Sequence, residues 1–269
     1  MINLGIITDK YHLERKSSEL IKYLRTKAKL SFYIEEEYLL NHSKLKYDEN
    51  LFFVKAKGDI ILAMVKILEN ETSIPVINSY KGIWTALHRF INSTLLQKAG
   101  IPVPHFTLNP EKIPPNFKDY ISKNIIDQKN YSFEPEIKKE NGFLHVMDRR
   151  AIKEKIFFSH YFFYQEFIKS KWEYKIYGVG EELFYYKQIP VMVNPNKMES
   201  RRKIVEIPEI GELVFKAMDV LDLKITSVDF LKSKEGKFFL TDINSSPNFN
   251  YMENGPKIVG DYLISKAKK

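Results

Sequence analysis

Strand-like and helix-like segments alternate along the first 78 residues of this chain. Residues 3–8, for example, form an apolar run that is typical of a buried strand. The region continues with a helix through 13–24, strands at 31–34 and 51–54, a helix at 58–68 and a strand at 74–77. Strands that alternate with helices pair in parallel, because each helix brings the chain back to the end of the sheet at which the previous strand began. We therefore expect residues 1–78 to form an α/β domain with a small parallel sheet.

Several common classes of protein are excluded by what the sequence lacks. No Gly-x-Gly-x-x-Gly follows the first strand, which argues against a dinucleotide-binding domain. The absence of cysteine excludes disulfides, thiolate metal sites and cysteine nucleophiles. The apolar runs are shorter than the roughly 18 residues of a membrane helix, and the N-terminus lacks the charged region of a signal peptide. We expect a cytoplasmic protein with no membrane partner.

The chain is basic, with 42 Lys and Arg residues against 34 Asp and Glu residues and a net charge of +8. An excess of positive charge favours an anionic partner. The lysines are scattered and form no dense basic stripe with interleaved aromatic residues, so nucleic acid is not expected. Two interpretations remain open, namely a small anionic substrate and a lysine-rich surface that keeps the protein soluble. The sequence leaves the oligomeric state open.

A helix and a linker are expected to follow the N-terminal domain. Residues 79–98 have helical character, and Gly100 with the proline-rich segment 101–104 cannot continue the helix. We expect residues 79–104 to connect the first domain to a second one over residues 105–269.

The second domain has a poorly patterned beginning and a clearer end. Residues 109–141 are rich in Pro, Lys and Asn and show little periodicity, which predicts a long loop. Beyond it we expect strands over 161–167 and 173–179 and a helix with an apolar stripe over 213–221.

Two strand candidates near the C-terminus, 225–231 and 237–244, are expected to form a hairpin. A two-residue turn at Glu235-Gly236 would place Asp229 directly opposite Asp242, and Ser227 opposite Asn244. A four-residue loop would make the carboxylates diagonal neighbours, and an odd loop would require a bulge to keep them on one face.

Two carboxylates at cross-strand distance repel each other and lose hydration if their face is covered. A cation between them would relieve this repulsion. Asp229, Asp242 and the amide oxygen of Asn244 are hard oxygen ligands, which favour Mg²⁺. The alternative is a pair of solvated acids on an open sheet face.

Six short segments occur in an order that resembles the ATP-grasp superfamily. They are Asn78-Ser79, 99–104, 165–168, 173–180, Val228-Asp229 and 242–247. The resemblance covers about residues 75–265, and the N-terminal region fits the pre-ATP-grasp domain of that superfamily. It implies an α+β fold of two subdomains, about 105–165 and 166–269, with ATP bound between them.

The resemblance also implies roles for individual residues. The adenine would lie against the linker formed by Gln165, Glu166, Phe167 and Ile168. Arg89 and Lys123 match basic residues that neutralise phosphate charge. Asp229, Asp242 and Asn244 match the Mg²⁺ ligands.

Within the superfamily, the sequence resembles the inositol polyphosphate 5/6-kinases more than the ribosomal-protein glutamate ligases. His145-Val-Met147 and 174–180 stand in the order of the kinase motifs, whereas the ligases carry Glu-x-Asn at the metal, a Gly-rich phosphate loop and Arg in place of Lys175. We therefore expect a kinase that transfers the γ-phosphoryl group of ATP to a hydroxyl of a phosphorylated polyol.

For this kinase, the expected catalytic residues are Lys175 and His145. The expected substrate residues are Lys55, His145, Lys187, Arg201 and Asn248. A carboxylate–amine ligase that forms an acyl phosphate is the alternative, with Arg201-Arg202-Lys203 near the phosphates, and a nucleotide-sensing module without turnover is a third possibility. The kinase requires Lys55, His145, Lys175 and Lys187 to converge opposite the face that carries Asp229 and Asp242.

Overall fold

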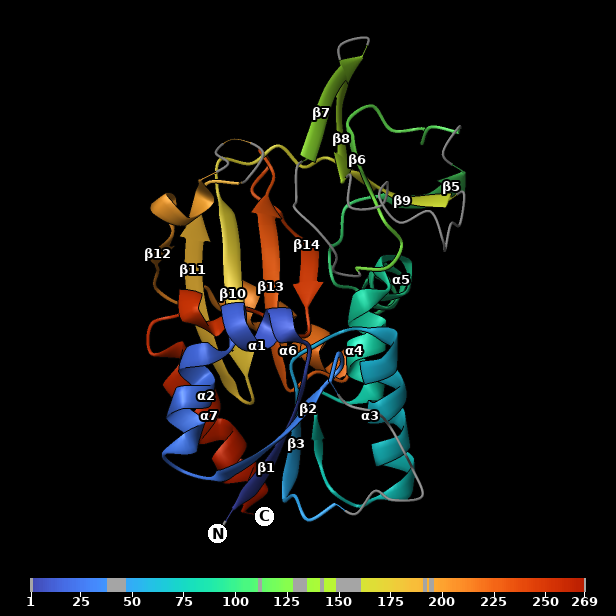
Figure 1. The fold of residues 1–269 in the computed structure, drawn as a ribbon. Coiled ribbons are helices and arrows are strands. Elements are labelled where there is room, and N and C mark those ends of the chain that lie inside the picture. Colours follow the sequence, from blue (N-terminus) through green and yellow to red (C-terminus); the bar gives the residue numbers. More distant parts are fainter. Residues whose placement is uncertain are drawn as a thin grey trace.

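The computed structural model describes residues 2–37, 47–110, 113–127, 135–140, 143–148, 161–190, 193 and 196–268, with the backbone alone for 135–148. Within these residues the strands form three sheets, which are distributed along the long axis of the molecule (Figure 1). Both termini lie at the end formed by the N-terminal sheet (Figure 1). The mixed α/β and α+β class expected from the sequence is confirmed.

The N-terminal sheet is fully parallel, as predicted, with strand order β2-β1-β3-β4. Its strands are β1 (Asn3–Thr8), β2 (Lys29–Ile34), β3 (Leu51–Val54) and β4 (Val76–Ile77). The helices between them are α1 (Lys10–Lys16), α2 (Ser18–Arg25) and α3 (Asp59–Glu71). The single helix predicted through 13–24 is wrong, because it is interrupted at Ser17, which leaves the α-helical region.

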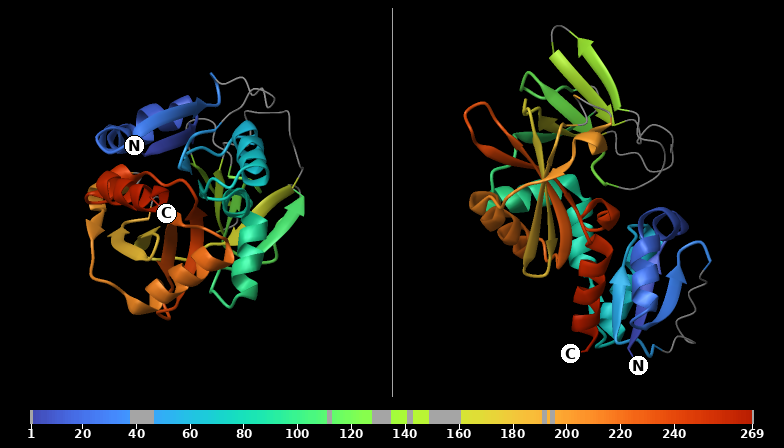
Figure 2. Two further views of the ribbon diagram at one scale, coloured as in Figure 1. Left: turned by 90° about the horizontal axis from the view of Figure 1, so that it is seen from below. Right: turned by 90° about the vertical axis from the view of Figure 1, so that its left-hand side faces the viewer.

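The C-terminal helix α7 (Gly255–Ala267) packs between the N-terminal sheet and the C-terminal sheet (Figure 2). Its Gly260 allows the ring of Tyr23 on α2 to approach closely, since a Cβ there would lie 2.5 Å from that ring. Leu24 and Phe53 from the N-terminal segment share one buried cluster with Tyr177 and Leu263. The two ends of the chain are therefore held together by a common hydrophobic core.

The connection expected as one helix over 79–98 consists of two, α4 (Tyr80–Leu87) and α5 (Arg89–Lys98). The prediction is wrong at His88, whose backbone is extended at φ −89° and ψ 96°. His88 pairs with Ile126 in an isolated bridge, so a contact remote in the sequence interrupts the helix. The helix ends as predicted, with Gly100 at a φ of 75°.

The middle sheet has strands at 120–123 and 135–140, inside the stretch 109–141 for which the sequence predicted only a long loop, and it also contains the strand expected over 161–167. Its strand order is β5-β9-β6-β8-β7. The strands are β5 (Phe106–Pro110), β6 (Tyr120–Lys123), β7 (Pro135–Glu140), β8 (Phe143–Asp148) and β9 (Tyr161–Glu166). Strand β6 pairs with β8 and β9, which lie about 20 to 40 residues later in the chain. It is therefore stabilised by pairing with distant strands and not by its own sequence pattern.

The C-terminal sheet has the order β12-β11-β10-β13-β14, and helix α6 (Pro208–Val220) covers one of its faces (Figure 2). The strands are β10 (Glu173–Val179), β11 (Glu182–Gln188), β12 (Arg202–Lys203), β13 (Ile225–Lys232) and β14 (Phe238–Asn244). Ile176 and Val228 pack with Val214 of α6 on the covered face. Their neighbours along each strand point to the opposite face. One end of that face, with Tyr177 and Ile225, packs against α7, and the other end is polar.

The β13–β14 turn differs from the predicted two-residue turn at Glu235-Gly236. The amide of Ser233 donates to the carbonyl of Lys237 at 2.8 Å, which closes a three-residue loop with Gly236 at a φ of 87°. A bulge at Thr241 then shifts the register, so that Asp229 lies opposite Asp242 as predicted. The odd loop and the bulge compensate for each other.

Candidate functional site

A row of four polar side chains crosses the face of the C-terminal sheet that is turned away from α6. Tyr186, Lys175, Asp229 and Asp242 occupy directly opposed positions on β11, β10, β13 and β14. Directly opposed residues project to the same side of a sheet. The structure therefore brings together Lys175 and two of the three expected metal ligands on the face turned away from α6.

Lys175 and Asp229 form an ion pair in the middle of this row. The Lys175 Nζ atom lies 2.5 Å from Asp229 Oδ1, and the two side chains are only 14% and 13% exposed. Burial lowers the pKa of Lys175, but the carboxylate of Asp229 more than compensates, and the net pKa is raised above its ordinary value. Lys175 therefore remains a cation and offsets the repulsion between the two carboxylates.

The next row on the same face contains Ser227 and Asn244, which also lie opposite each other. Asn244 Oδ1 accepts a hydrogen bond from the amide of Ser246 at 2.9 Å, which fixes the amide group at the end of β14. The buried Ser227 hydroxyl has no hydrogen-bond partner among the described residues. Oxygen atoms of Asp229, Asp242, Asn244 and Ser227 thus occupy two adjacent rows. No group of three or more His, Cys, Asp or Glu residues suited to a metal occurs in the part of the chain that the structure describes.

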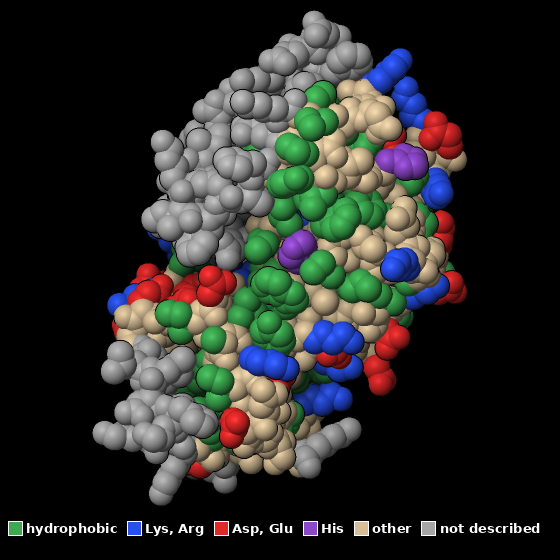
Figure 3. Space-filling view, turned by 90° about the vertical axis from the view of Figure 1, so that its right-hand side faces the viewer, with side chains coloured by type: hydrophobic (Ala, Val, Ile, Leu, Met, Phe, Trp, Pro, Cys, Tyr) green, Lys and Arg blue, Asp and Glu red, His purple; other side chains and the backbone are tan. Residues whose placement is uncertain are grey.

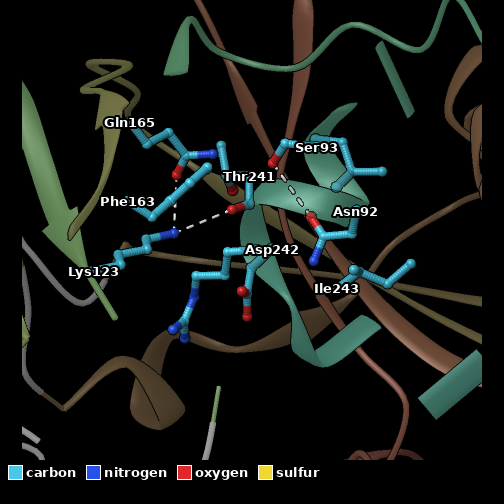
Figure 4. Close-up of a pocket in the computed structure, with 10 residues that line it drawn as sticks. Asn92, Ser93, Lys123, Phe163, Gln165, Thr241, Asp242 and Ile243 are labelled. Carbon is cyan, nitrogen blue, oxygen red and sulfur yellow. Dashed lines mark hydrogen bonds between the residues drawn. The ribbon is translucent and has the colours of Figure 1, made fainter. Parts of the chain in front are cut away.

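Asp242 also lines a pocket between the middle sheet and the C-terminal sheet (Figure 4). Lys123 of β6 reaches into this pocket and donates from Nζ to Gln165 Oε1 at 2.9 Å and to the Thr241 carbonyl at 3.2 Å. The bulge at Thr241 makes that carbonyl available, because the extra residue has no opposite partner on β13. Asn92 and Ser93 of α5 form another wall (Figure 4).

Arg89 lines the same pocket but is engaged by the segment after β6. Its guanidinium donates to the Asn124 carbonyl at 2.8 Å and to Asp127 Oδ1 at 2.6 Å. The other oxygen of Asp127 lies 2.9 Å from Lys57 Nζ. The Arg89 Nε atom is buried without a partner among the described residues. Asp127 and Lys57 were not expected from the sequence, where nothing marks them as partners of Arg89.

The segment Gln165–Ile168, for which the sequence predicted a linker role, includes the end of β9 and leads toward β10. The amide of Glu166 donates to the His105 carbonyl at 2.7 Å, and the amide of Phe167 donates to the Asp119 carbonyl at 2.9 Å. These bonds fix the first half of the segment to the middle sheet. Gln165, only 3% exposed, points at Lys123.

Arg201 lies over the polar face and is held by two residues that the sequence did not single out. Its Nε donates to Gln188 Oε1 at 2.6 Å, and its Nη1 donates to the Tyr177 hydroxyl at 3.1 Å. Burial raises the pKa of Tyr177, so the hydroxyl stays protonated. The strand period of two from Lys175 is the signal that marks Tyr177 as a residue of this face.

The remaining expected residues do not gather at this face. Lys187 lies opposite Tyr174 on the other side of the sheet, and its Nζ is 5.0 Å from the centre of the Trp172 ring. Lys55 is completely buried at the end of β3, where its Nζ donates to the Pro247 carbonyl. The predicted convergence of these two lysines is therefore not observed.

Two further substrate candidates lie elsewhere. His145 belongs to β8, where its backbone pairs with Tyr120, and its side chain lies outside the described residues. Asn248 caps a short 3₁₀ helix, Phe249–Tyr251, by accepting the amide of Asn250 at 3.1 Å.

Comparisons with solved structures agree over nearly the whole chain. A RiPP-associated ATP-grasp ligase from Chryseobacterium gregarium, in complex with ADP and a leader and core peptide, is 15% identical with a TM-score of 0.70 and covers 99% of this chain and 97% of its own. The chain has the ATP-grasp fold. D-alanine–D-alanine ligase from Bacillus anthracis, complexed with ATP, is 14% identical with a TM-score of 0.68, covering 100% of this chain and 98% of its own.

A third similar structure is the RimK domain ATP-grasp protein from Sphaerobacter thermophilus, at 12% identity and a TM-score of 0.67, with 97% of this chain and 99% of that one covered. Neither a family model nor a curated protein matches the sequence. The ATP-grasp resemblance inferred from short motifs is thus supported at the level of the fold, whereas none of these three structures is named as an inositol polyphosphate kinase. Among the described helices, none is long and apolar enough to cross a membrane.

Proposed function

We propose that this protein is an ATP-dependent carboxylate–amine ligase that acts through an acyl phosphate. The observation that carries the proposal is the distribution of cations around the polar face. Lys175 and Arg201 lie over that face, whereas Lys55 is buried beneath the Pro247 loop and Lys187 projects from the opposite side. A kinase for a polyphosphorylated polyol requires several cations at the acceptor site. A ligase requires one or two donors beside the transferring phosphoryl group.

The similarity to named ligases supports the same choice. The Chryseobacterium and Bacillus proteins are both described as ligases, with ADP and ATP bound respectively. Another similar structure, the ligase PsnB, contains Mg and ADP. These nucleotides belong to those proteins, and we infer ATP and Mg²⁺ for this chain from its own residues.

The oxygen atoms on the polar face fit Mg²⁺. Asp229 and Asp242 supply carboxylates, Asn244 supplies an amide oxygen, and the unpartnered hydroxyl of Ser227 lies in the same row as Asn244. Such a hard-oxygen set is suited to Mg²⁺ and unsuited to softer metals. When bound, Mg²⁺ would offset charge on the β- and γ-phosphates of ATP.

The nucleotide would lie in the pocket between the middle and C-terminal sheets. Gln165, Glu166, Phe167 and Ile168 would face the adenine, and Lys123 and Arg89 would contact phosphate oxygens. Lys123 can exchange its bonds to Gln165 and Thr241 for phosphate oxygens without losing its charge. Arg89 has a spare donor at Nε.

The reaction would proceed in two steps. A carboxylate oxygen of the substrate attacks the γ-phosphorus of ATP, the bond to the β–γ bridging oxygen breaks, and ADP leaves. The amine nitrogen then attacks the carbonyl carbon of the acyl phosphate. The tetrahedral intermediate expels phosphate, and the nitrogen loses its proton to solvent. Lys175 and Arg201 would stabilise the developing negative charge by donating hydrogen bonds.

Transfer of an isotope label tests this proposal. Amino acids and peptides with ¹⁸O-labelled carboxylates are incubated with ATP, Mg²⁺ and a panel of amines, and the released phosphate is analysed by mass spectrometry. A ligase transfers one ¹⁸O atom from the carboxylate to phosphate. Arg201→Met should lower the rate at least tenfold, and Lys187→Met, which removes a lysine on the other side of the sheet, should leave it unchanged. Stable phosphorylation of inositol phosphates without released phosphate would refute the ligase.

A further inference from the structure

A basic groove lies at the end of the C-terminal sheet, where the segment after β9 meets the β13–β14 turn. Residues 169–172 and Tyr174 form one wall, and residues 232–234 form the other. The cavity measures about 270 Å³. It shares no lining residue with the pocket around Asp242 and belongs to none of the functions assigned above.

The groove is lined by positive charge alone. Lys169, Lys171, Lys232 and Lys234 contribute to its walls, and no Asp or Glu does. Within the described part of the chain, none of these four lysines forms an ion pair. Glu235 of the same turn is exposed and does not line the groove, although its carboxylate interacts with Ser233 and Lys234 at the rim. On the face of the molecule seen in Figure 3, by contrast, Lys and Arg side chains are interspersed with Asp and Glu.

Aromatic rings fix several of the cations at this end of the sheet. Arg202 and Lys187 lie 4.8 Å and 5.0 Å from the centre of the Trp172 ring. Lys232 Nζ lies 4.7 Å from the centre of the Phe238 ring. These contacts already restrict the long side chains. The side chains therefore lose less conformational entropy when an anion binds and orders them.

The backbone of the groove is also organised before any partner binds. Ser170 Oγ accepts the amide of Lys232 at 3.2 Å and donates to the Trp172 carbonyl at 2.8 Å. One hydroxyl thus ties the two walls together. The spacing of the lysines on the two walls is therefore set by the fold.

We propose that this groove docks an acidic peptide segment, with Asp or Glu side chains reaching the lysines of both walls. Charge complementarity identifies the partner as anionic. Nucleic acid is disfavoured because the Trp172 ring, which would be needed to stack a base, is already engaged by Arg202 and Lys187. A membrane surface is disfavoured because the lysines line a concave cavity, whereas a bilayer presents its headgroups as a plane.

Peptide binding to the full-length protein provides the test. A fluorescein-labelled octaglutamate peptide is titrated by anisotropy at low salt, with an octaglutamine peptide as the neutral control. Two triple variants carry the same change in net charge, namely K171E/K232E/K234E in the groove and K22E/K216E/K257E on exposed positions of α2, α6 and α7. Circular dichroism melting establishes that both variants fold.

The groove variant should bind octaglutamate at least tenfold more weakly, and the control variant should differ from the original protein by less than threefold. Binding should also change the Trp172 emission, and this change should vanish in Trp172→Phe. Equal loss in both variants would overturn the proposal, because net charge alone would then account for binding. So would the absence of octaglutamate binding, or tighter groove-dependent binding of a single-stranded RNA octamer or of phosphatidylserine vesicles.

Discussion

Replacement of Asn78 by alanine should destabilise the protein strongly, because this side chain joins the N-terminal sheet to the C-terminal sheet. Asn78 follows β4 and is 1% exposed. Its Nδ2 donates to the carbonyls of Ile225 at 2.7 Å and Ser245 at 2.8 Å. Its Oδ1 accepts the amides of Lys224 at 2.8 Å and Ile225 at 3.0 Å. The amide group therefore uses both donor hydrogens and both acceptor positions.

The magnitude follows from the backbone groups that the substitution would leave unpaired. Asn78→Ala removes all four bonds, and each buried polar group left without a partner costs about 1–3 kcal/mol. A water molecule that enters the space would restore part of this loss. We expect the free energy of unfolding to fall by about 3–5 kcal/mol, which is a large fraction of the roughly 5–15 kcal/mol of a typical domain.

Urea denaturation followed by circular dichroism measures this change. Asn250→Ala, at an exposed position, is the matched control and should change the free energy of unfolding by less than about 0.5 kcal/mol. Asn78→Asp should be at least as damaging as Asn78→Ala at neutral pH, because a carboxylate cannot donate to the Ile225 and Ser245 carbonyls. A loss below about 1 kcal/mol for Asn78→Ala, together with a stable Asn78→Asp, would refute the stabilising role of the four Asn78 hydrogen bonds.

Three further substitutions test other parts of the structure. Burial lowers the pKa of Lys55, so between the folded and unfolded pKa values the unfolded chain binds more protons than the folded protein. The stability of the original protein relative to Lys55→Met should therefore rise with pH toward 10.5. Urea denaturation at several pH values measures this difference, and a difference that does not change with pH would contradict the prediction. Asp242→Asn should abolish the rise in melting temperature caused by ATP with Mg²⁺. Asp219→Asn, at an exposed position of α6, should retain this rise. Gly82→Ala would place a Cβ 2.2 Å from the Asp222 carbonyl oxygen and should cost about 1–3 kcal/mol of stability, so unchanged urea unfolding would argue against this contact.

Local sequence patterns predicted the elements whose stabilising contacts are periodic. The strand expected over 173–179 has those bounds in the structure, because it alternates between the polar face and the α6 face. The opposition of Asp229 and Asp242 was also predicted, although by a different route. The turn has an odd number of residues, and the bulge at Thr241 restores the register. No residue type in 233–241 specifies that compensation.

The remaining features depend on contacts between distant segments. The helix break at His88 arises from pairing with Ile126, and β6 is stabilised by strands that follow much later in the chain. The same limit applies to the candidate site. Lys175 was predicted from its motif, but the engagement of Arg89 by Asp127 appears only once the chain has folded.

Trapping with hydroxylamine tests directly whether the protein activates a carboxylate with ATP. The protein is incubated with ATP, Mg²⁺, the carboxylate panel and hydroxylamine, which replaces the unknown amine because it attacks any acyl phosphate. A ligase should produce a hydroxamate together with equal amounts of ADP and phosphate, and Asp242→Asn should abolish all three products. A stable phosphate ester on an inositol phosphate, with no hydroxamate from any carboxylate, would contradict the ligase and restore the kinase.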